Sequence, residues 1–337
     1  MTYKRQQQNF FKFLLILTIK IIRYKVLNGI MSDETHYTIH RNMVILLISI
    51  TIFLFITRIL VNIFDFPLLL DGSRDVDFKI LLQGLKNGLV NFYDPVPVPE
   101  GVPDWPPYYL YFWYFIFYPM GLIPFEVGVY IWDLLRLITS SYIVLKGFKL
   151  IKNRTNLLWF YFAIAVGFFI DGWYNNCNFL IVFFLLFSYT SLEKDKMWLS
   201  GIFFAISTIK INSILFIPVL LIAKKIKVKD LIYYVIPFIL LCLPYIIFPD
   251  YLFQMLNNWT NTTPGIQGLT FLDPIIWKAV QPSHLMFLGF MAIIIFESLE
   301  KYKRSDQIRN ALILILIAFY IYLSIVVMIL PSIFSPI

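Results

Sequence analysis

The chain has 337 residues, of which 59% are apolar, 19% aromatic and 14% charged, and its mean hydropathy is +0.75. A soluble globular domain is roughly 45–50% apolar and about 25% charged, so this composition excludes an ordinary soluble enzyme. The net charge of +8 comes from basic residues in short joints between apolar blocks, so it indicates membrane orientation and not a nucleic-acid partner. Two cysteines, Cys177 and Cys242, make neither a disulfide framework nor a zinc site. The sequence predicts no cofactor and no metal.

The segment 1–42 comes first and is predicted to be cytoplasmic. Its block 9–30 is apolar but carries four basic residues, which favours an amphipathic helix on the membrane surface over a crossing. The rest of the chain, 43–337, is expected to be one transmembrane domain with external loops at 65–123 and 250–283.

Eight apolar blocks are long enough to enter or cross the bilayer. The block 197–223 is too long for one crossing, and its interruption at Lys210-Ile211-Asn212-Ser213 predicts two helices that meet at a polar break. The sequence therefore predicts an all-α polytopic membrane protein with about nine transmembrane helices. The blocks lie at 43–64, 124–145, 157–171, 178–192, 197–223, 231–249, 284–298 and 311–330.

The basic residues predict the orientation of this bundle. With a cytoplasmic N-terminus, the cytoplasmic joints hold 21 of the 28 Lys and Arg residues, whereas the two external loops hold four. Short cytoplasmic loops carry such an excess of positive charge. Because 146–154 holds four of these bases, the segment 108–123 is expected to be an external re-entrant or interfacial helix. The functional face would then be extracellular, or luminal in an endoplasmic reticulum membrane.

The first external loop is rich in carboxylates, seven against three bases. The spacing of apolar residues predicts a surface helix over Val76–Val90, with Asp75 and Asp77 in its first turn. Carboxylates are favoured there by the helix dipole, which is a sufficient structural explanation for both residues. The alternative is that one of them is a general base toward an acceptor hydroxyl.

An aromatic stretch follows in the same loop. From Trp105 to Tyr118, 10 of the 14 residues are aromatic, including Tyr108 and Tyr109. Trp and Tyr concentrate at the headgroup layer, so this stretch is typical of an aromatic belt. Aromatic faces also bind sugars and isoprenoid chains, and the two interpretations are compatible.

Ionisable residues within apolar blocks are costly and are by default candidates for function. Asp133 and Arg136 stand three apart on one predicted helix, which favours a structural ion pair over a catalytic role. Lys210, at the helix break on the external side, is either a phosphate anchor or a lysine that reaches out to the interface. His284 lies where the second external loop re-enters the membrane, and Asn258-Trp259-Thr260 in that loop matches the glycosylation pattern.

The order of these features resembles glycosyltransferase family 87, the polyprenyl-phosphate-mannose-dependent mannosyltransferases of the GT-C fold. The resemblance covers about 70–220. The same order of features is similar, more loosely, to the first mannosyltransferase of glycosylphosphatidylinositol assembly, which has an Asp-x-Asp in this loop. The motifs that carry it are Asp75-Val76-Asp77-Phe78, GLVNFYDP, Trp105-Pro106-Pro107, Gly172 with Asn175 and Asn178, and GIFFAISTIK ending in Lys210.

The resemblance implies transfer of a sugar, mannose by analogy, from a polyprenyl-phosphate carrier to a lipid or glycan hydroxyl on the external face, among membrane lipids. Asp77, with Asp75 second, is expected to be the base in an inverting reaction. Lys210 and Arg74 are expected to bind the donor phosphate, and the remaining site residues to bind substrate: Trp105, Tyr108, Tyr109, Asn175, Asn178 and His284. The alternatives are a transporter or flippase of lipid-linked glycans, and a noncatalytic membrane subunit.

Overall fold

The structure, a computed structural model, describes residues 33–64, 75–88, 90–94, 107, 109–151, 154–261 and 285–300. Every regular element in these residues is a helix. The predicted amphipathic helix at 9–30 and the predicted crossing at 311–330 lie outside the described residues.

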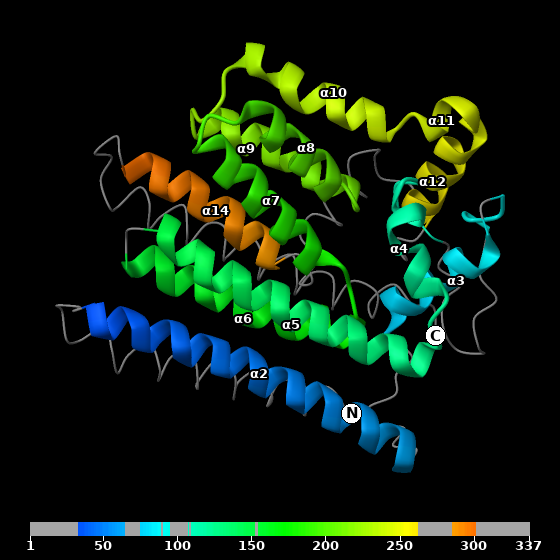
Figure 1. Ribbon diagram of the computed structural model, residues 1–337, viewed down its shortest axis with the longest axis horizontal. Helices are drawn as coiled ribbons and strands as arrows, with labels where there is room; N and C mark the ends of the chain where they lie inside the picture. Colours follow the sequence, from blue (N-terminus) through cyan, green and yellow to red (C-terminus); the bar gives the residue numbers. More distant parts are fainter. Residues whose placement is uncertain are drawn as a thin grey trace, which may run out of the picture.

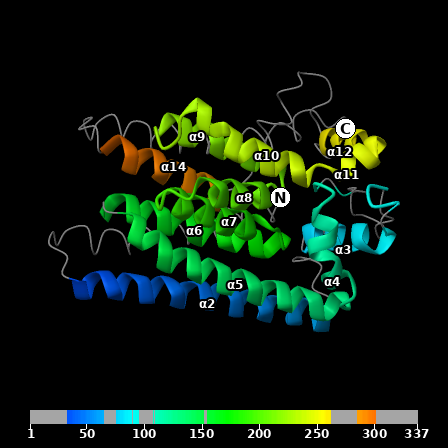
Figure 2. The ribbon, with the colours of Figure 1, turned by 45° about the horizontal axis from the view of Figure 1, so that its top comes forward.

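Three long helices form one layer of the bundle: α2 (Asp33–Phe64), α5 (Phe125–Leu150) and α6 (Arg154–Tyr174). They pack against one another and run side by side (Figures 1 and 2). Among the described helices these three are long and apolar enough to cross a membrane. Each contains one of the blocks predicted at 43–64, 124–145 and 157–171, because a continuous run of about 20 apolar residues satisfies its backbone internally as a helix.

A second layer of shorter apolar helices covers the first. It consists of α7 (Asn178–Leu192), α8 (Met197–Ser207), α9 (Phe216–Ile222), α10 (Ile232–Leu241) and α14 (Leu285–Glu300). Within it α7 packs on α8 and α8 on α10, while α14 packs on α6 of the first layer.

Two glycines allow these helices to approach closely. A Cβ added at Gly201 of α8 would lie 1.7 Å from the backbone oxygen of Tyr233, and one added at Gly167 of α6 would lie 2.6 Å from the backbone nitrogen of Met286. Small residues at such crossings let backbones meet without a side chain between them.

The predicted break at Lys210 is confirmed. Helix α8 ends at Ser207, Lys210 is extended, and a 3₁₀ turn over Ile211–Leu215 leads into α9. The polar run between the apolar blocks therefore marks the point where the chain turns back into the bundle.

The block 231–249 does not form the single helix expected for a crossing. Helix α10 ends at Leu241, and the chain continues as α11 (Pro244–Ile247) and α12 (Pro249–Asn261). Pro244 and Pro249 each begin a helix, and neither has the N–H that would continue the preceding one. Nine crossings remain a prediction, since the described residues contain three full-length ones.

Four short helices gather at one end of the bundle, which we call the site end: α3 (Val76–Asn87), α4 (Trp113–Gly121), α11 and α12 (Figures 1 and 2). The helix predicted over Val76–Val90 is confirmed and ends at Asn87, where Gly88 adopts φ +82°. Asp77 lies in its first turn as predicted, whereas Asp75 precedes the helix in a left-handed conformation. The aromatic segment becomes helical only at Trp113. With nine residues, α4 is too short to cross the bilayer, as predicted for 108–123.

Candidate functional site

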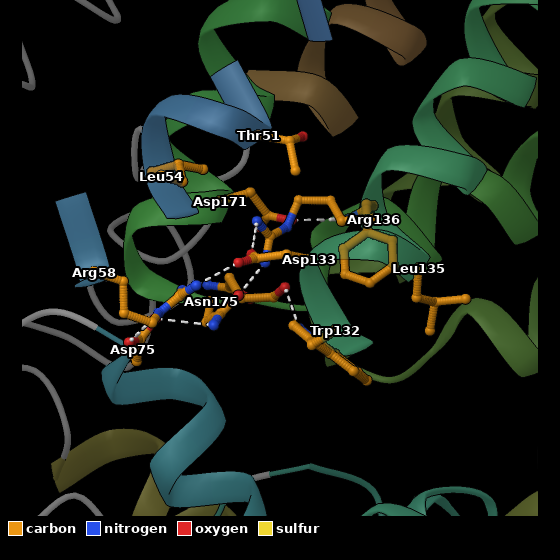
Figure 3. Close-up of polar contacts among 12 residues, drawn as sticks. Thr51, Leu54, Arg58, Asp75, Trp132, Asp133, Leu135, Arg136, Asp171 and Asn175 are labelled. Carbon is orange, nitrogen blue, oxygen red and sulfur yellow. Dashed lines mark hydrogen bonds and ion pairs between the residues drawn. The ribbon is translucent and has the colours of Figure 1, made fainter. Parts of the chain in front are cut away.

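A ring of buried charged and amide side chains joins α2, α5 and the turn after α6 to Asp75, the residue that precedes α3 (Figure 3). Arg58 of α2 donates through Nη2 and Nε to the two carboxylate oxygens of Asp75, over 2.8 and 3.1 Å. Its Nη1 donates to Asp133 of α5 over 2.5 Å. Bidentate pairing of this kind fixes the orientation of both groups, so Arg58 ties the start of α3 to the bundle.

The ring closes through Arg136 and Asn175. Arg136 donates through Nη1 to Asp133 over 2.7 Å and through Nη2 to the side-chain oxygen of Asn175. The amide of Asn175 then donates to Asp75 over 2.9 Å. The predicted pairing of Asp133 with Arg136 is confirmed, and Arg58 is a further partner. We call these five residues the charge ring.

The backbone around the charge ring explains why short polar residues occupy it. Asp75 and Asn175 have φ of +58° and +55°, and Asp and Asn tolerate this left-handed region better than most residues. The N–H of Asp75 donates to the carbonyl of Trp173 over 3.1 Å, which joins the two turns. The two arginines and two aspartates of the ring balance in charge, as burial requires.

Lys210 lies in a second cluster beside the ring. Its Nζ donates to the side-chain oxygen of Asn176 over 2.6 Å, and the same oxygen accepts the N–H of Cys177 over 2.7 Å. The Tyr109 ring lies 5.9 Å from Nζ, and the Tyr109 side chain lies near the Cys177 thiol. The lysine is thus held by an amide and an aromatic face, with 6% of its surface exposed.

Asp171 lies between the two clusters. Its Oδ2 accepts the N–H of Phe179 over 3.3 Å and lies 3.9 Å from Nε of Arg136, whereas Oδ1 is buried without a hydrogen-bond partner among the described residues. Both Asp77 and Lys210 are close enough to act electrostatically on this carboxylate. The start of α3 and the break after α8 both contact the chain where α6 ends, since Asp75 bonds to Trp173 and Lys210 bonds to Asn176.

Several residues predicted from the sequence share this region. Asp75, Asp77, Asn175 and Lys210 are buried within or beside the two clusters, and Tyr109 covers Lys210. Asn178 begins α7 and is fully buried. Four predicted site residues lie outside the part of the chain that the structure describes: Arg74, Trp105, Tyr108 and His284.

Sequence reasoning did not assign Arg58 or Asn176 to the site. An arginine within an apolar block requires a buried partner, so the position of Arg58 already indicated a role in the bundle. Its partners could not be identified from the sequence, because they are 17 and 75 residues away. Asn176 had no separate signal inside the GWYNNCN turn. Among the described residues, no group of three or more His, Cys, Asp or Glu side chains is arranged to hold a metal ion.

Comparison with known proteins identifies the family. The model of glycosyltransferase family 87 matches residues 108–332, which is two thirds of the chain. No curated protein and no solved structure matches. The matched segment contains α4 to α14 and, within them, Asp133, Arg136, Asp171 and Lys210. This chain, whose described elements are all helices and include three of membrane-spanning length, belongs to glycosyltransferase family 87.

Proposed function

We propose that the protein is a membrane glycosyltransferase that moves a sugar, mannose, from a polyprenyl-phosphate carrier to a hydroxyl of a lipid or glycan on the external face. Membership of the family indicates glycosyl transfer. The observation that carries the rest is that the start of α3, with the carboxylate of Asp77 in its first turn, and the Lys210 cation both lie where α6 ends, through the bonds from Asp75 to Trp173 and from Lys210 to Asn176.

The phosphate of the donor is assigned to Lys210. A leaving phosphate needs a positive charge close to where its own charge develops. The ammonium group of Lys210, held at a helix break, can supply this charge without a large movement of the side chain. Asn176 and Tyr109 hold Nζ in place. Arg74, next to Asp75 in the chain, is proposed as a second phosphate ligand.

The general base is assigned to Asp77. Both oxygens of Asp75 already accept hydrogen bonds from Arg58, and one also accepts from Asn175. Each oxygen of Asp75 is thus held by a donor of the protein, which fits a structural role for this carboxylate. Asp75 is therefore proposed to position α3, and Asp77, two residues later in the first turn, to take the acceptor proton. One carboxylate acting on the acceptor predicts inversion at the anomeric carbon.

The aromatic loop is proposed to bind the sugar and the lipid chain, with Tyr109 beside the phosphate and Trp105 and Tyr108 nearby in sequence. His284 and Asn178 are proposed to complete the substrate site. Asn175 acts through the charge ring, since its oxygen and its amide are bonded to Arg136 and Asp75.

A transporter or flippase is the competing function. It would need buried charges that face a path across the membrane. In the charge ring Asp133 is bonded to both Arg58 and Arg136. These bonds are explained by ion pairing within the bundle and give no specific support to a transport function.

Transfer of radiolabelled sugar from polyprenyl-phosphate-mannose to lipid and glycan acceptors tests the proposal in purified protein. Asp77→Asn is expected to lower kcat by about 10²–10⁴-fold, the usual contribution of a general base. Asp94→Asn is the matched control, because Asp94 is an exposed aspartate of the same loop. Transfer that survives in Asp77→Asn refutes the assignment of the base, and no transfer by the unsubstituted protein with several lipid-linked sugars refutes the donor class.

A further inference from the structure

Side chains from α12 hold the two stretches of chain that precede α4. The amide of Asn258 donates to the carbonyl of Tyr93 over 2.8 Å and to the carbonyl of Pro107 over 2.9 Å. The hydroxyl of Tyr251 donates to the carbonyl of Val90 over 2.8 Å. Asn258 is 8% exposed, so one buried side chain joins two backbone segments that are 14 residues apart in the chain.

Tyr245 of α11 adds a second set of bonds to the same stretches. Its hydroxyl accepts the N–H of Tyr111 over 2.9 Å and lies 2.7 Å from the hydroxyl of Tyr93. The Tyr93 hydroxyl in turn donates to the carbonyl of Tyr109 over 2.6 Å. Burial raises the pKa of Tyr93 well above its usual value, so this phenol keeps its proton and remains a donor at physiological pH.

These bonds position Tyr109, whose ring lies against Lys210. The backbone of Tyr109 is held by Tyr93, and its neighbour Tyr111 is held by Tyr245. The side chain of Tyr109 then lies against Lys210 and the Cys177 thiol. Because the bonds that hold Tyr109 and Tyr111 are made to their backbone, their loss would release the position of Tyr109 without removing any group of the site.

We propose that α11 and α12 form a clasp, made by Tyr245, Tyr251 and Asn258, that fixes Tyr109 over Lys210 and thereby sets the affinity for the donor phosphate. Asn258 and Tyr245 are positioning residues in this arrangement. The effect on the donor rests on the proposed function, whereas the effect on Tyr109 does not.

The clasp also gives the Asn258-Trp259-Thr260 pattern a structural meaning. Glycosylation would attach a sugar to the amide nitrogen of Asn258, which donates to two carbonyls and is buried. The folded chain does not present this nitrogen as an acceptor.

The Cys177 thiol reports the position of Tyr109 without any need for enzyme activity. Cys177 is 2% exposed and is one of two cysteines in the chain, so a Cys242→Ser background leaves it as the single thiol. The rate of its reaction with a maleimide is measured in the folded protein. Asn258→Asp, which places a carboxylate against two carbonyls, is expected to raise this rate at least about tenfold, as expected for the loss of one or two hydrogen bonds.

Matched variants separate the clasp from general loosening. Asn257→Asp makes the same change at an exposed neighbour and is expected to leave the rate unchanged. Tyr245→Phe removes only a hydroxyl and is expected to raise the rate several-fold. Tyr234→Phe is its control, because it removes another buried tyrosine hydroxyl, one that bonds to Ser200 between α8 and α10.

In the transfer assay, Asn258→Asp and Tyr245→Phe are expected to raise KM for the polyprenyl-phosphate donor about tenfold, with a smaller change in kcat. Unchanged labelling of Cys177 in both variants, or an equal rise in Tyr234→Phe, overturns the clasp. Faster labelling with an unchanged KM overturns its role in donor binding. If the unsubstituted protein transfers no sugar, the proposed function fails, and the labelling alone decides the clasp.

Discussion

Asp75 and Asp77 stand two residues apart and have different surroundings. Asp75 is bonded to Arg58 and Asn175 and belongs to the charge ring, while Asp77 lies within electrostatic reach of Asp171. The different neighbours of the two residues support the different roles proposed for them.

The charge ring makes a stability prediction at Arg58. Removing one partner of a buried ion pair typically costs about 3–5 kcal/mol, since the remaining charges are left without compensation. Arg58→Met removes the charged partner of Asp75 and one of the two charged partners of Asp133, so we expect a loss of that size in the free energy of unfolding. Denaturant unfolding in detergent measures it.

Lys225→Met is the control for Arg58→Met. It breaks a 2.6 Å pair with Glu193 that is partly exposed, and exposed pairs contribute about 0–1 kcal/mol. Equal losses in the two variants would contradict a special role for the charge ring.

Gly172 lies against the same ring and gives a second prediction. An added Cβ would lie 2.7 Å from Nη1 of Arg136 and 2.4 Å from Cδ1 of Leu54. Gly to Ala in a helix normally stabilises by about 1 kcal/mol, but here overpacking is expected to cost about 1–3 kcal/mol. Combining Gly172→Ala with Leu54→Ala removes only the contact with leucine. We expect the double variant to lose less stability than the sum of the two single variants, because Leu54→Ala makes room for the added methyl group, and thermal unfolding of the three variants measures the difference.

At the scale of elements, the sequence predicted what depends on neighbours in the chain. The long helices follow from apolar runs, α3 from the helical spacing after Asp75, and the Asp133–Arg136 pair from helix geometry at i, i+3. The break at Lys210 followed from a polar interruption that has no place inside a crossing helix.

What the sequence did not predict depends on packing between distant segments. The bond from Arg58 to Asp133 spans 75 residues, and that from Lys210 to Asn176 spans 34. No local period encodes such pairings. The split of 231–249 into α10 and α11 was missed because its hydropathy is uninterrupted, although Pro244 marks the break.

The approach of α8 to α10 carries a prediction for these elements. A Cβ at Gly201 would lie 1.7 Å from the carbonyl oxygen of Tyr233, which is backbone and has no rotamer to change. Gly201→Ala is therefore expected to separate the helices and to lower the melting temperature more than Gly172→Ala does. Gly128→Ala is the control, since its Cβ would lie 3.2 Å from the ring of Phe78. A melting temperature for Gly201→Ala at or above that of the unsubstituted protein would show that the two helices do not meet at this glycine.

At the scale of the whole molecule, the two ends of the bundle differ in chemistry. Helix α7 leaves the site end at Asn178, and α8 returns to it near Lys210, so their joint at 193–196 lies at the opposite end. The joint between α9 and α10 lies there as well. These two joints hold six basic residues: Lys194, Lys196, Lys224, Lys225, Lys227 and Lys229. Positive charge in short joints marks the cytoplasmic side, which supports an external site end.

Cysteine substitutions at two valines test this orientation with the same labelling reaction. Val90, at the site end, and Val228, in the joint before α10, are each 74% exposed. In a background with both native cysteines replaced by serine, Val90→Cys is expected to react with a membrane-impermeant maleimide in intact cells, and Val228→Cys only after permeabilisation. Equal exposure makes the two rates comparable, and labelling of both after permeabilisation verifies that each thiol is reactive. The reverse pattern would place Asp77 and Lys210 on the cytoplasmic side. The sugar donor would then have to present its phosphate to that side, and the predicted external location of the reaction would be wrong.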